Sequence, residues 1–302
     1  MNCATHLNDL SPEFSSRVLR DVSMAKYTSW HAGGAAQMFF APRNASDLAA
    51  FLRQLPAHIP LLWLGLGSNL LVRDGGFPGA VIHTHGALGL LERISATTIN
   101  VEAGVPCARI ARQCVKWGLG PAEFLAGIPG TLGGALAMNA GAWGSETWQH
   151  VVEVDVLDRR GVRRTRRPAE YTIGYRSVVG PADEWFIGAR LVFERQPGAN
   201  SDAIRELLER RRQTQPIGEW SCGSVFANPP GNYAARLIET AGLKGFRIGD
   251  ASVSLKHANF IINHGAASAG DIEAVILHVQ RTIEAMYHVV LQPEVRIVGV
   301  AA

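Results

Sequence analysis

The sequence predicts an α+β protein, because helical and strand patterns of hydrophobic residues both occur along it. Residues 46–55 (SDLAAFLRQL) begin with a capping Ser or Asp and repeat apolar residues at helical spacing. The IPLLWL that follows at 59–64 has the composition of a short buried strand. Farther along, residues 151–158 (VVEVDVLD) alternate, which is typical of a strand with one buried face. The helical and strand patterns together indicate the α+β class.

The other elements follow from the same signals. A helix is predicted from Pro106 to Trp117, because Pro is favoured in a first turn and Gly118 stands just beyond the end. Further strands are expected at 80–85 (AVIHTH), at 97–104 (TTINVEAG) and, after a turn at Arg160-Gly161, at 185–194 (WFIGARLVFE).

The pattern changes around residues 196–200 (QPGAN), after which a charged helix is expected at 202–213. A domain boundary is therefore predicted there. We expect an N-terminal extension at 1–22, a first domain at 23–195 with subdomains of about 23–85 and 86–195, and a C-terminal domain at 196–302.

The composition is that of a packed globular protein. Hydrophobic residues make up 47% of the 302 residues and charged residues 18%, so neither a disordered chain nor a fibrous repeat is indicated. The formal net charge of +3 is small for this length, and mean charge alone predicts no polyanion partner.

The cysteines and apolar runs indicate a cytoplasmic location. Four cysteines, without a CxxC or regular spacing, suggest neither a zinc site nor a disulfide framework, and a reducing cytosol is expected. The most apolar run, 59–72, is interrupted by glycines and polar residues and is too short to span a membrane. No secretory signal is expected at the N-terminus, where charged residues (Asp9, Glu13, Arg17 and Arg20) flank no apolar core.

Residues 64–72 (LGLGSNLLV) form the first segment whose residue types suit the binding of a ligand. A buried strand runs into a turn with two glycines and two small polar residues, and then into another strand. Glycines let the main chain approach a phosphate closely, while Ser68 and Asn69 add hydrogen-bonding side chains. The segment is not a GxGxxG of a βαβ unit, since no helix follows. Taken alone, a tight hairpin is the simpler interpretation.

Residues 124–141 (FLAGIPGTLGGALAMNAG) form the second segment. It carries five glycines and almost no charge, whereas an ordinary loop would be more polar. Close approach of the backbone to a large flat ligand explains this composition, and helix packing on small residues is the alternative. Two such segments in one chain favour a bound cofactor.

Together with YTSWHAGG (27–34), these two segments resemble the FAD-binding region of the vanillyl-alcohol-oxidase/PCMH superfamily. Four later blocks, IGYRSVV, CGSVFANP, AGLKGFRIGDASVSLKHANFIIN and LQPEVRIVG, narrow the resemblance to the MurB family of UDP-N-acetylenolpyruvoylglucosamine reductases. The resemblance spans about residues 20–300. It implies a VAO/PCMH-type FAD-binding fold of two α+β subdomains with a C-terminal α+β substrate-binding domain, acting in peptidoglycan precursor synthesis.

The resemblance also implies the reaction. In this family NADPH reduces a non-covalent FAD, and a hydride then passes to C3 of UDP-N-acetylglucosamine enolpyruvate, which becomes UDP-N-acetylmuramate. The family's catalytic residues fall on Arg176, Ser224 and Glu294. Arg176 would stabilise the enolate, Glu294 would orient or assist, and Ser224 would protonate C2. Taken singly, each could instead be structural: Arg176 pairing with a surface carboxylate, Ser224 capping a turn, or Glu294 pairing with Arg296.

Further contacts are carried over from the resemblance. No metal site is expected, since His257 and His264 lack partners at ligand spacing. The expected FAD contacts are Tyr27, Thr28, Gly65, Gly67, Ser68, Asn69, Leu70, Ile128, Pro129, Gly130, Thr131, Gly133, Gly134, Ala135, Asn139, Ala140 and Gly141, and the expected substrate contacts are Tyr175, Gln215, Asn228, Lys256 and His257.

Two features depart from the family pattern. The 48 positions from Arg176 to Ser224 are too few for a loop that folds over the substrate, which indicates the loop-lacking type II class. Ala227 also stands where the family usually has a basic residue before Asn228. Lys256, His257, Gln215 or an arginine of 210–212 could replace it, and the sequence does not choose among them.

Residues 158–167 (DRRGVRRTRR) contain six arginines, which would suit a nucleic-acid surface. The run straddles a predicted hairpin turn, so a solvated outer face is the ordinary interpretation, and no nucleic-acid partner is expected. Two other functions stay open: an oxidase of small alcohols on the same fold, and a flavin-free polyanion-binding protein. No membrane insertion is expected, and the chain is predicted to be a monomer or weak dimer.

Overall fold

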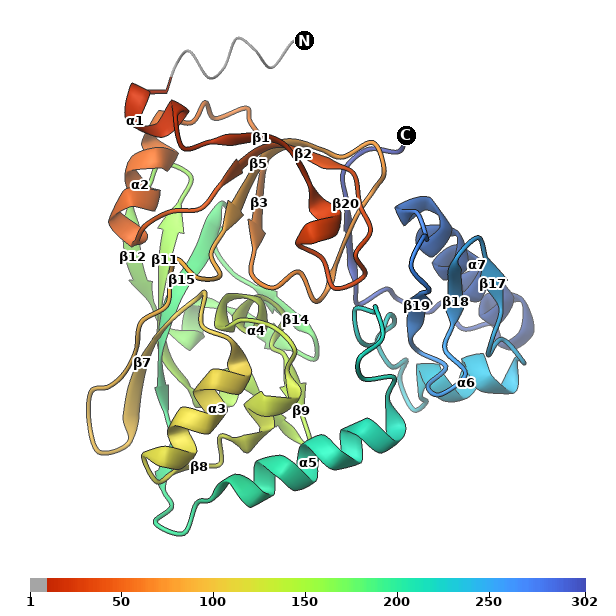
Figure 1. Ribbon diagram of the computed structural model, residues 1–302. Coiled ribbons are helices and arrows are strands. Elements are labelled where there is room, and N and C mark those ends of the chain that lie inside the picture. The colour runs from red at the N-terminus through yellow and green to blue at the C-terminus, as the bar shows by residue number, and fades with distance from the viewer. Residues whose placement is uncertain (1–9) are drawn as a thin grey trace. The chain divides into compact units, whose positions relative to one another are not determined.

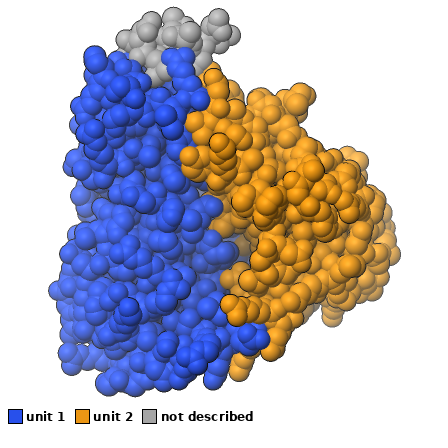
Figure 2. Space-filling view, viewed as in Figure 1, with its two compact units in different colours: residues 1–20, 38–66, 79–209 blue, residues 21–37, 67–78, 210–302 orange. Residues whose placement is uncertain are grey.

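The computed structural model describes residues 10–302, so Cys3 and Asp9 lie outside the described part (Figure 1). The chain divides into two compact units, which Figure 2 colours separately. The predicted boundaries near residues 22 and 195 define contiguous domains and stay a prediction. Of the described residues, unit 1 holds 10–20, Met38–Leu66 and Gly79–Glu209, and unit 2 holds Asp21–Gln37, Gly67–Pro78 and Arg210–Ala302.

A four-stranded sheet has the order β1 (Leu19–Ser23), β2 (Ala35–Phe40), β5 (Phe77–His83) and β3 (Leu61–Leu64). Strands β3 and β5 run parallel. Between β2 and β3 lies helix α2 (Ala45–Gln54), which confirms the helix expected at 46–55, although its N-cap is Asn44. The Asn44 side chain accepts a hydrogen bond from the backbone N–H of Asp47 at 2.9 Å, which satisfies one of the free donors of the first turn.

The core beneath α2 is aromatic. Phe40 of β2 stacks on Phe51 of α2 with 4.0 Å between ring centroids. Phe14 of the short helix α1 (Pro12–Ser15) meets the Phe51 ring edge-on at 5.7 Å. These rings bury large apolar areas and hold the first helices on the sheet.

Unit 1 also contains a five-stranded antiparallel sheet in the order β12 (Arg163–Arg166), β11 (Val151–Asp158), β15 (Glu184–Val192), β7 (Thr98–Glu102) and β6 (Leu91–Arg93) (Figure 1). Strands β11, β15 and β7 confirm three predicted strands. The sequence did not predict β12, because its residues RRTR lack an apolar alternation.

Helix α3 (Cys107–Lys116) confirms the helix predicted from Pro106, and Pro106 is its N-cap. The glycine-rich segment that follows forms two short helices, η4 (Glu123–Gly127) and α4 (Leu132–Met138), and a small hairpin of β9 (Gly141–Ala142) and β10 (Ser145–Glu146). The remaining short elements of unit 1 are β8 (Leu119–Gly120), η5 (Thr147–His150), η6 (Pro168–Glu170), β13 (Thr172–Gly174), β14 (Ser177–Val179) and β16 (Glu194–Arg195).

Unit 2 is built on helix α7 (Ala269–Tyr287), which buries a stripe of aliphatic residues at helical spacing. Ser268 and Asp271 form a capping box at its start. The helix packs on an antiparallel sheet of β17 (Arg247–Ile248), β18 (Ala251–Val253) and β19 (Ile261–Asn263). The other elements are η3 (Met24–Lys26), β4 (Leu70–Val72), α6 (Ala234–Thr240) and β20 (Arg296–Val298), while α5 (Ser201–Thr214), predicted at 202–213, contributes residues to both units.

The described residues contain no helix long and apolar enough to cross a membrane, and no group of three or more His, Cys, Asp or Glu side chains that could hold a metal ion. His264 instead hydrogen-bonds with the Ser252 hydroxyl at 2.8 Å. The three described cysteines, Cys107, Cys114 and Cys222, are free and buried. Burial raises the pKa of the Cys107 and Cys114 thiols to about 12.

Candidate active site

The turn at residues 65–69 is not a β-hairpin. Strand β3 before it pairs with β5, whereas β4 after it pairs in parallel with β20. The turn also includes Gly67 in the left-handed region, with a φ of +63°. The simpler hairpin interpretation of LGLGSNLLV is therefore wrong, and a different account of its glycines is needed.

The two glycine-rich segments lie in contact within unit 1. A Cβ added at Gly65 would overlap with the hydroxyl of Thr131, just before helix α4. Gly133, in the first turn of α4, would place a Cβ 3.1 Å from that of Ala103. Gly65 thus leaves no room for a side chain and brings the end of β3 close to the residue before α4, whereas a side chain at Gly133 would require Ala103 to shift by a few tenths of an ångström.

In unit 2, the same turn packs against the segment 27–34. A Cβ on Gly67 would overlap with the carbonyl of Tyr27. The backbone N–H of Ser29 donates to the carbonyl of Gly67 at 3.2 Å, and Thr28 Oγ1 donates to the carbonyl of Ala32 at 2.9 Å. The hydroxyl of Ser29 is buried and has no hydrogen-bond partner among residues 10–302. Such a group costs free energy unless a partner outside the chain completes it.

Gly134 supplies the test of whether a large cofactor fits. It lies in the first turn of α4 and is exposed, and a Cβ there would meet no atom of the chain within 4 Å. Gly in a helix costs roughly 0.5–1 kcal/mol relative to Ala. Nothing in the described chain requires this glycine, so space for a bound group explains it. The uncharged, glycine-bearing start of α4 fits FAD.

Arg176 stands at the tip of a two-residue hairpin loop, because Gly174 of β13 pairs with Ser177 of β14. Its φ is +53°, a left-handed conformation that costs a non-glycine residue roughly 1–2 kcal/mol. The guanidinium donates to the carbonyls of Asn139 (3.4 Å) and Gly141 (3.1 Å), at the end of the predicted FAD segment. It also lies 5.2 Å from the centre of the exposed Tyr175 ring. These two hydrogen bonds to carbonyls hold Arg176 against the segment.

The backbone segments that carry Ser224 and Glu294 are paired in unit 2. The residue after Ser224, Val225, accepts a hydrogen bond from the backbone N–H of Glu294 at 2.7 Å. The Asn69 side chain donates to the carbonyl of Glu294 at 2.9 Å, which attaches the first glycine-rich turn to the same place. Ser224 is half-buried, and its hydroxyl bonds to no residue of 10–302. Burial first, and then the nearby Glu294 carboxylate, raise the pKa of the Cys222 thiol.

The predicted substrate contacts are spread over several elements. Gln215, just after α5, accepts from Arg211 Nε at 2.7 Å, and the Lys256 ammonium donates to the carbonyl of Arg212. Burial, and more weakly the positive charge of Lys244, lower the pKa of His257. Asn228 accepts from the backbone N–H of Ala234 and so begins α6. These contacts keep Gln215 and Lys256 at the same end of α5, and the backbone N–H of Ala227 donates to the carbonyl of Gln292.

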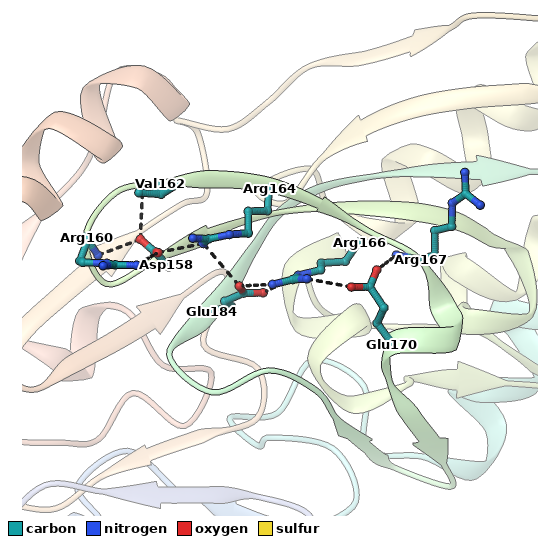
Figure 3. A network of polar contacts seen from close by, with 8 residues as sticks. All are labelled: Asp158, Arg160, Val162, Arg164, Arg166, Arg167, Glu170 and Glu184. Carbon is teal, nitrogen blue, oxygen red and sulfur yellow. Dashed lines mark hydrogen bonds and ion pairs between the residues drawn. The ribbon is translucent and has the colours of Figure 1, made fainter.

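The arginine-rich run forms a charge-compensated network (Figure 3). Asp158 accepts from the backbone of Arg160 and Val162 and from the Arg164 guanidinium. Glu184 of β15 takes both a bidentate pair from Arg166 and a 3.6 Å contact from Arg164. Ion pairs between these arginines and carboxylates attach β12 to β11 and β15.

Sequence reasoning did not single out His83 and His85, which lie at the carboxyl end of β5. Burial first, and then the nearby His85, lower the pKa of His83, while a hydrogen bond to the backbone of Gly65 opposes the shift. The ring of His85 bonds to the carbonyl of Gly104 at 3.3 Å. The sequence signal that could have identified these two histidines is their HxH spacing at the end of a parallel strand.

The comparisons define the class of protein first. The sequence model of the FAD binding domain family matches residues 36–166, and that of the C-terminal domain of UDP-N-acetylenolpyruvoylglucosamine reductase matches residues 215–298. The chain thus contains an FAD-binding domain, and the predicted α+β fold is confirmed.

The chain belongs to the UDP-N-acetylenolpyruvoylglucosamine reductase family. It is 56% identical to the reductase of Alkalilimnicola ehrlichii over 92% of this chain and 93% of the relative, and 53% identical to that of Methylococcus capsulatus over 92% of each. The crystal structure of the MurB reductase from Thermus caldophilus is similar, with a TM-score of 0.80 and 34% identity over 93% of this chain and 98% of that one.

Proposed function

We propose that this protein reduces UDP-N-acetylglucosamine enolpyruvate to UDP-N-acetylmuramate, with NADPH as the source of hydride. The relatives that it matches over more than nine-tenths of its length bear the name of this reductase. The structural observation that supports the proposal is the backbone bond from Glu294 to Val225, which pairs the segment that carries Glu294 with the one that carries Ser224 in unit 2. Bound FAD supplies the hydride transfer that no side chain performs.

The chain's own residues manage charge and protons. Hydride delivery to C3 of the enolpyruvyl group leaves negative charge at C2 and on the adjoining carboxylate. Arg176 is always protonated and presents fixed donors, so it stabilises that charge. The Ser224 hydroxyl, free of intramolecular bonds among the described residues, donates its proton to C2. Glu294 orients the reacting group beside Ser224.

Arg176 lies in unit 1, whereas Ser224 and Glu294 lie in unit 2. We further propose that FAD is held without a covalent bond and that Lys256 or Gln215 contacts the substrate. The enzyme is proposed to belong to the loop-lacking type II class and to work in the cytoplasm as a monomer or weak dimer.

The test is a visible spectrum of the purified protein, followed by NADPH addition with and without substrate. We expect flavin absorption, bleaching on addition of NADPH, and recovery only when the enolpyruvyl substrate is added. Denaturation should release FAD into the supernatant. Bleaching by a small alcohol, with recovery on admission of oxygen, would instead support an oxidase, and a colourless protein with steeply salt-dependent DNA binding would support a polyanion-binding function.

A further inference from the structure

The side chain of Asn139 is fully engaged within unit 1. It is 2% exposed, and its amide nitrogen donates to Glu146 Oε2 at 2.8 Å and to the carbonyl of Gly174 at 3.1 Å. Its amide oxygen accepts from the backbone N–H of Trp148 at 3.1 Å. Both donors and one acceptor site are therefore used by the protein. A side chain committed in this way has no donor left for FAD, although it lies in the predicted FAD segment.

These bonds attach both ends of the Tyr175–Arg176 loop to one residue. The amide nitrogen of Asn139 holds Gly174, which precedes the loop, while its backbone carbonyl accepts from the Arg176 guanidinium at 3.4 Å. Asn139 ends helix α4 in a left-handed conformation with a φ of +45°, which Asn adopts more readily than other side chains. The residue thus joins the end of α4 to the tip of the β13–β14 hairpin.

Glu146 and Trp148 hold Asn139 in turn. The Glu146 carboxylate fixes the amide nitrogen, and the same side chain caps the short helix η5. The indole of Trp148 donates to the carbonyl of Leu136 in α4 at 2.8 Å and lies against Tyr171, just before β13. Each contact restricts the junction between α4 and the β13–β14 hairpin. Several independent bonds therefore fix the position of the hairpin relative to α4.

We propose that Asn139 is a positioning residue for Arg176: its side-chain amide, oriented by Glu146, fixes the β13–β14 hairpin so that the Arg176 guanidinium is held in one place. The inference rests on the proposed function of Arg176 and deepens it. Such a device matters because a displacement of about 1 Å from a remote change can slow catalysis on the order of 100-fold.

The principal variant is Asn139→Asp, which keeps the shape and the left-handed backbone but replaces the amide donor by an acceptor that faces Glu146 and the Gly174 carbonyl. Asn139→Gly is the second variant, since glycine accepts the backbone conformation and removes the side chain. The matched control is Asn44→Ala, which removes the N-cap of α2 and costs roughly 1 kcal/mol without touching the hairpin.

The first readout needs no loaded enzyme. In FAD-free protein, amide hydrogen exchange should accelerate across 172–179 in both Asn139 variants, accelerate at Trp148 in Asn139→Gly, which loses the acceptor of that N–H, and stay unchanged in Asn44→Ala. Unchanged exchange in the Asn139 variants would overturn the inference. Glu146→Gln retains an acceptor for the Asn139 amide and should exchange more slowly than Glu146→Ala.

The second readout is a double-mutant cycle on the two half-reactions. Asn139→Asp should slow substrate reduction about 100-fold, far more than it slows flavin reduction by NADPH. Combined with Arg176→Ala, it should add no more than about twofold to the loss caused by Arg176→Ala alone. Losses that multiply in full would overturn the inference. If Arg176→Ala itself leaves substrate reduction intact, the proposed function of Arg176 fails; if only Asn139→Asp is silent, the positioning inference alone fails.

Discussion

The backbone N–H of Glu294 donates to the carbonyl of Val225 at 2.7 Å, and this bond pairs the backbone of one family motif with the residue that follows Ser224 in another. Asn69, 225 positions away in the chain, donates its side-chain amide to the carbonyl of the same glutamate. The two bonds join the glycine-rich turn after β3 to the two segments of unit 2 that are expected to carry catalytic residues.

Ser224→Ala should separate the two half-reactions. Loss of the hydroxyl removes the proposed proton donor, which typically contributes about 10² to 10⁴ in rate, while reduction of the flavin by NADPH needs no such proton. Rapid-mixing absorbance measurements of each half-reaction provide the check. Substrate reduction at the normal rate in Ser224→Ala would show that another group protonates C2.

Glycine substitutions should separate folding from FAD binding. Gly134→Ala meets no atom of the chain within 4 Å and lies in a helix, so it should stabilise the FAD-free protein by up to about 1 kcal/mol. If the space serves the cofactor, the same methyl group should weaken FAD binding. The measurements are the thermal midpoint of the FAD-free protein and the dissociation constant for FAD.

Gly67→Val is the contrasting variant. Its Cβ would overlap with the carbonyl of Tyr27, and φ is +63°, so the turn itself must shift. We expect lower stability of the FAD-free protein and loss of bound flavin together. Full flavin occupancy in both Gly134→Ala and Gly67→Val would contradict the assignment of these segments to FAD.

The sequence predicted those elements whose pattern is local. Helix α2, helix α3 and strand β11 each carry a hydrophobic period that burial on one face requires, and all three were placed within a few residues. Strand β12 was missed because its arginines are stabilised by carboxylates on β11 and β15, which are tertiary partners. The parallel pairing of β4 with β20 was missed for the same reason, since nothing local encodes a contact across most of the chain.

For the site, motif resemblance found the segments but not the roles of side chains within them. In the sequence, Asn139 is one more residue of a glycine-rich segment. Its connection to Arg176 became apparent from the structure, where its backbone is left-handed and its side chain bonds to Gly174. Gly65 and Thr131 likewise gain meaning from their mutual contact. Resemblance identifies which residues recur in a family, whereas burial and bonding partners show what each one holds.

The arginine network should contribute to stability rather than to binding. Asp158→Ala leaves two backbone N–H groups and the Arg164 guanidinium without their carboxylate, and breaking a buried pair in this way costs about 3–5 kcal/mol at the upper limit. Because Arg164 is about one-third exposed and retains Glu184, we expect a smaller loss, about 2 kcal/mol. Denaturant titration measures the loss, and Arg167→Ala, at a guanidinium drawn without a partner in Figure 3, is the control.

Acid should weaken the join between α1 and α2. The hydrogen bond from Arg17 is the largest influence on Asp47 and lowers the pKa of that carboxyl, with Arg43 adding to the shift against the effect of burial. A carboxyl with a depressed pKa in the folded state stabilises that state fully above its unfolded pKa of about 3.9 and loses this contribution as the pH falls through the folded value. The thermal midpoint of the wild type should therefore approach that of Asp47→Asn as the pH falls from 6 toward about 3. A constant gap between the two midpoints over this range would show that the Arg17–Asp47 pair contributes nothing that depends on charge.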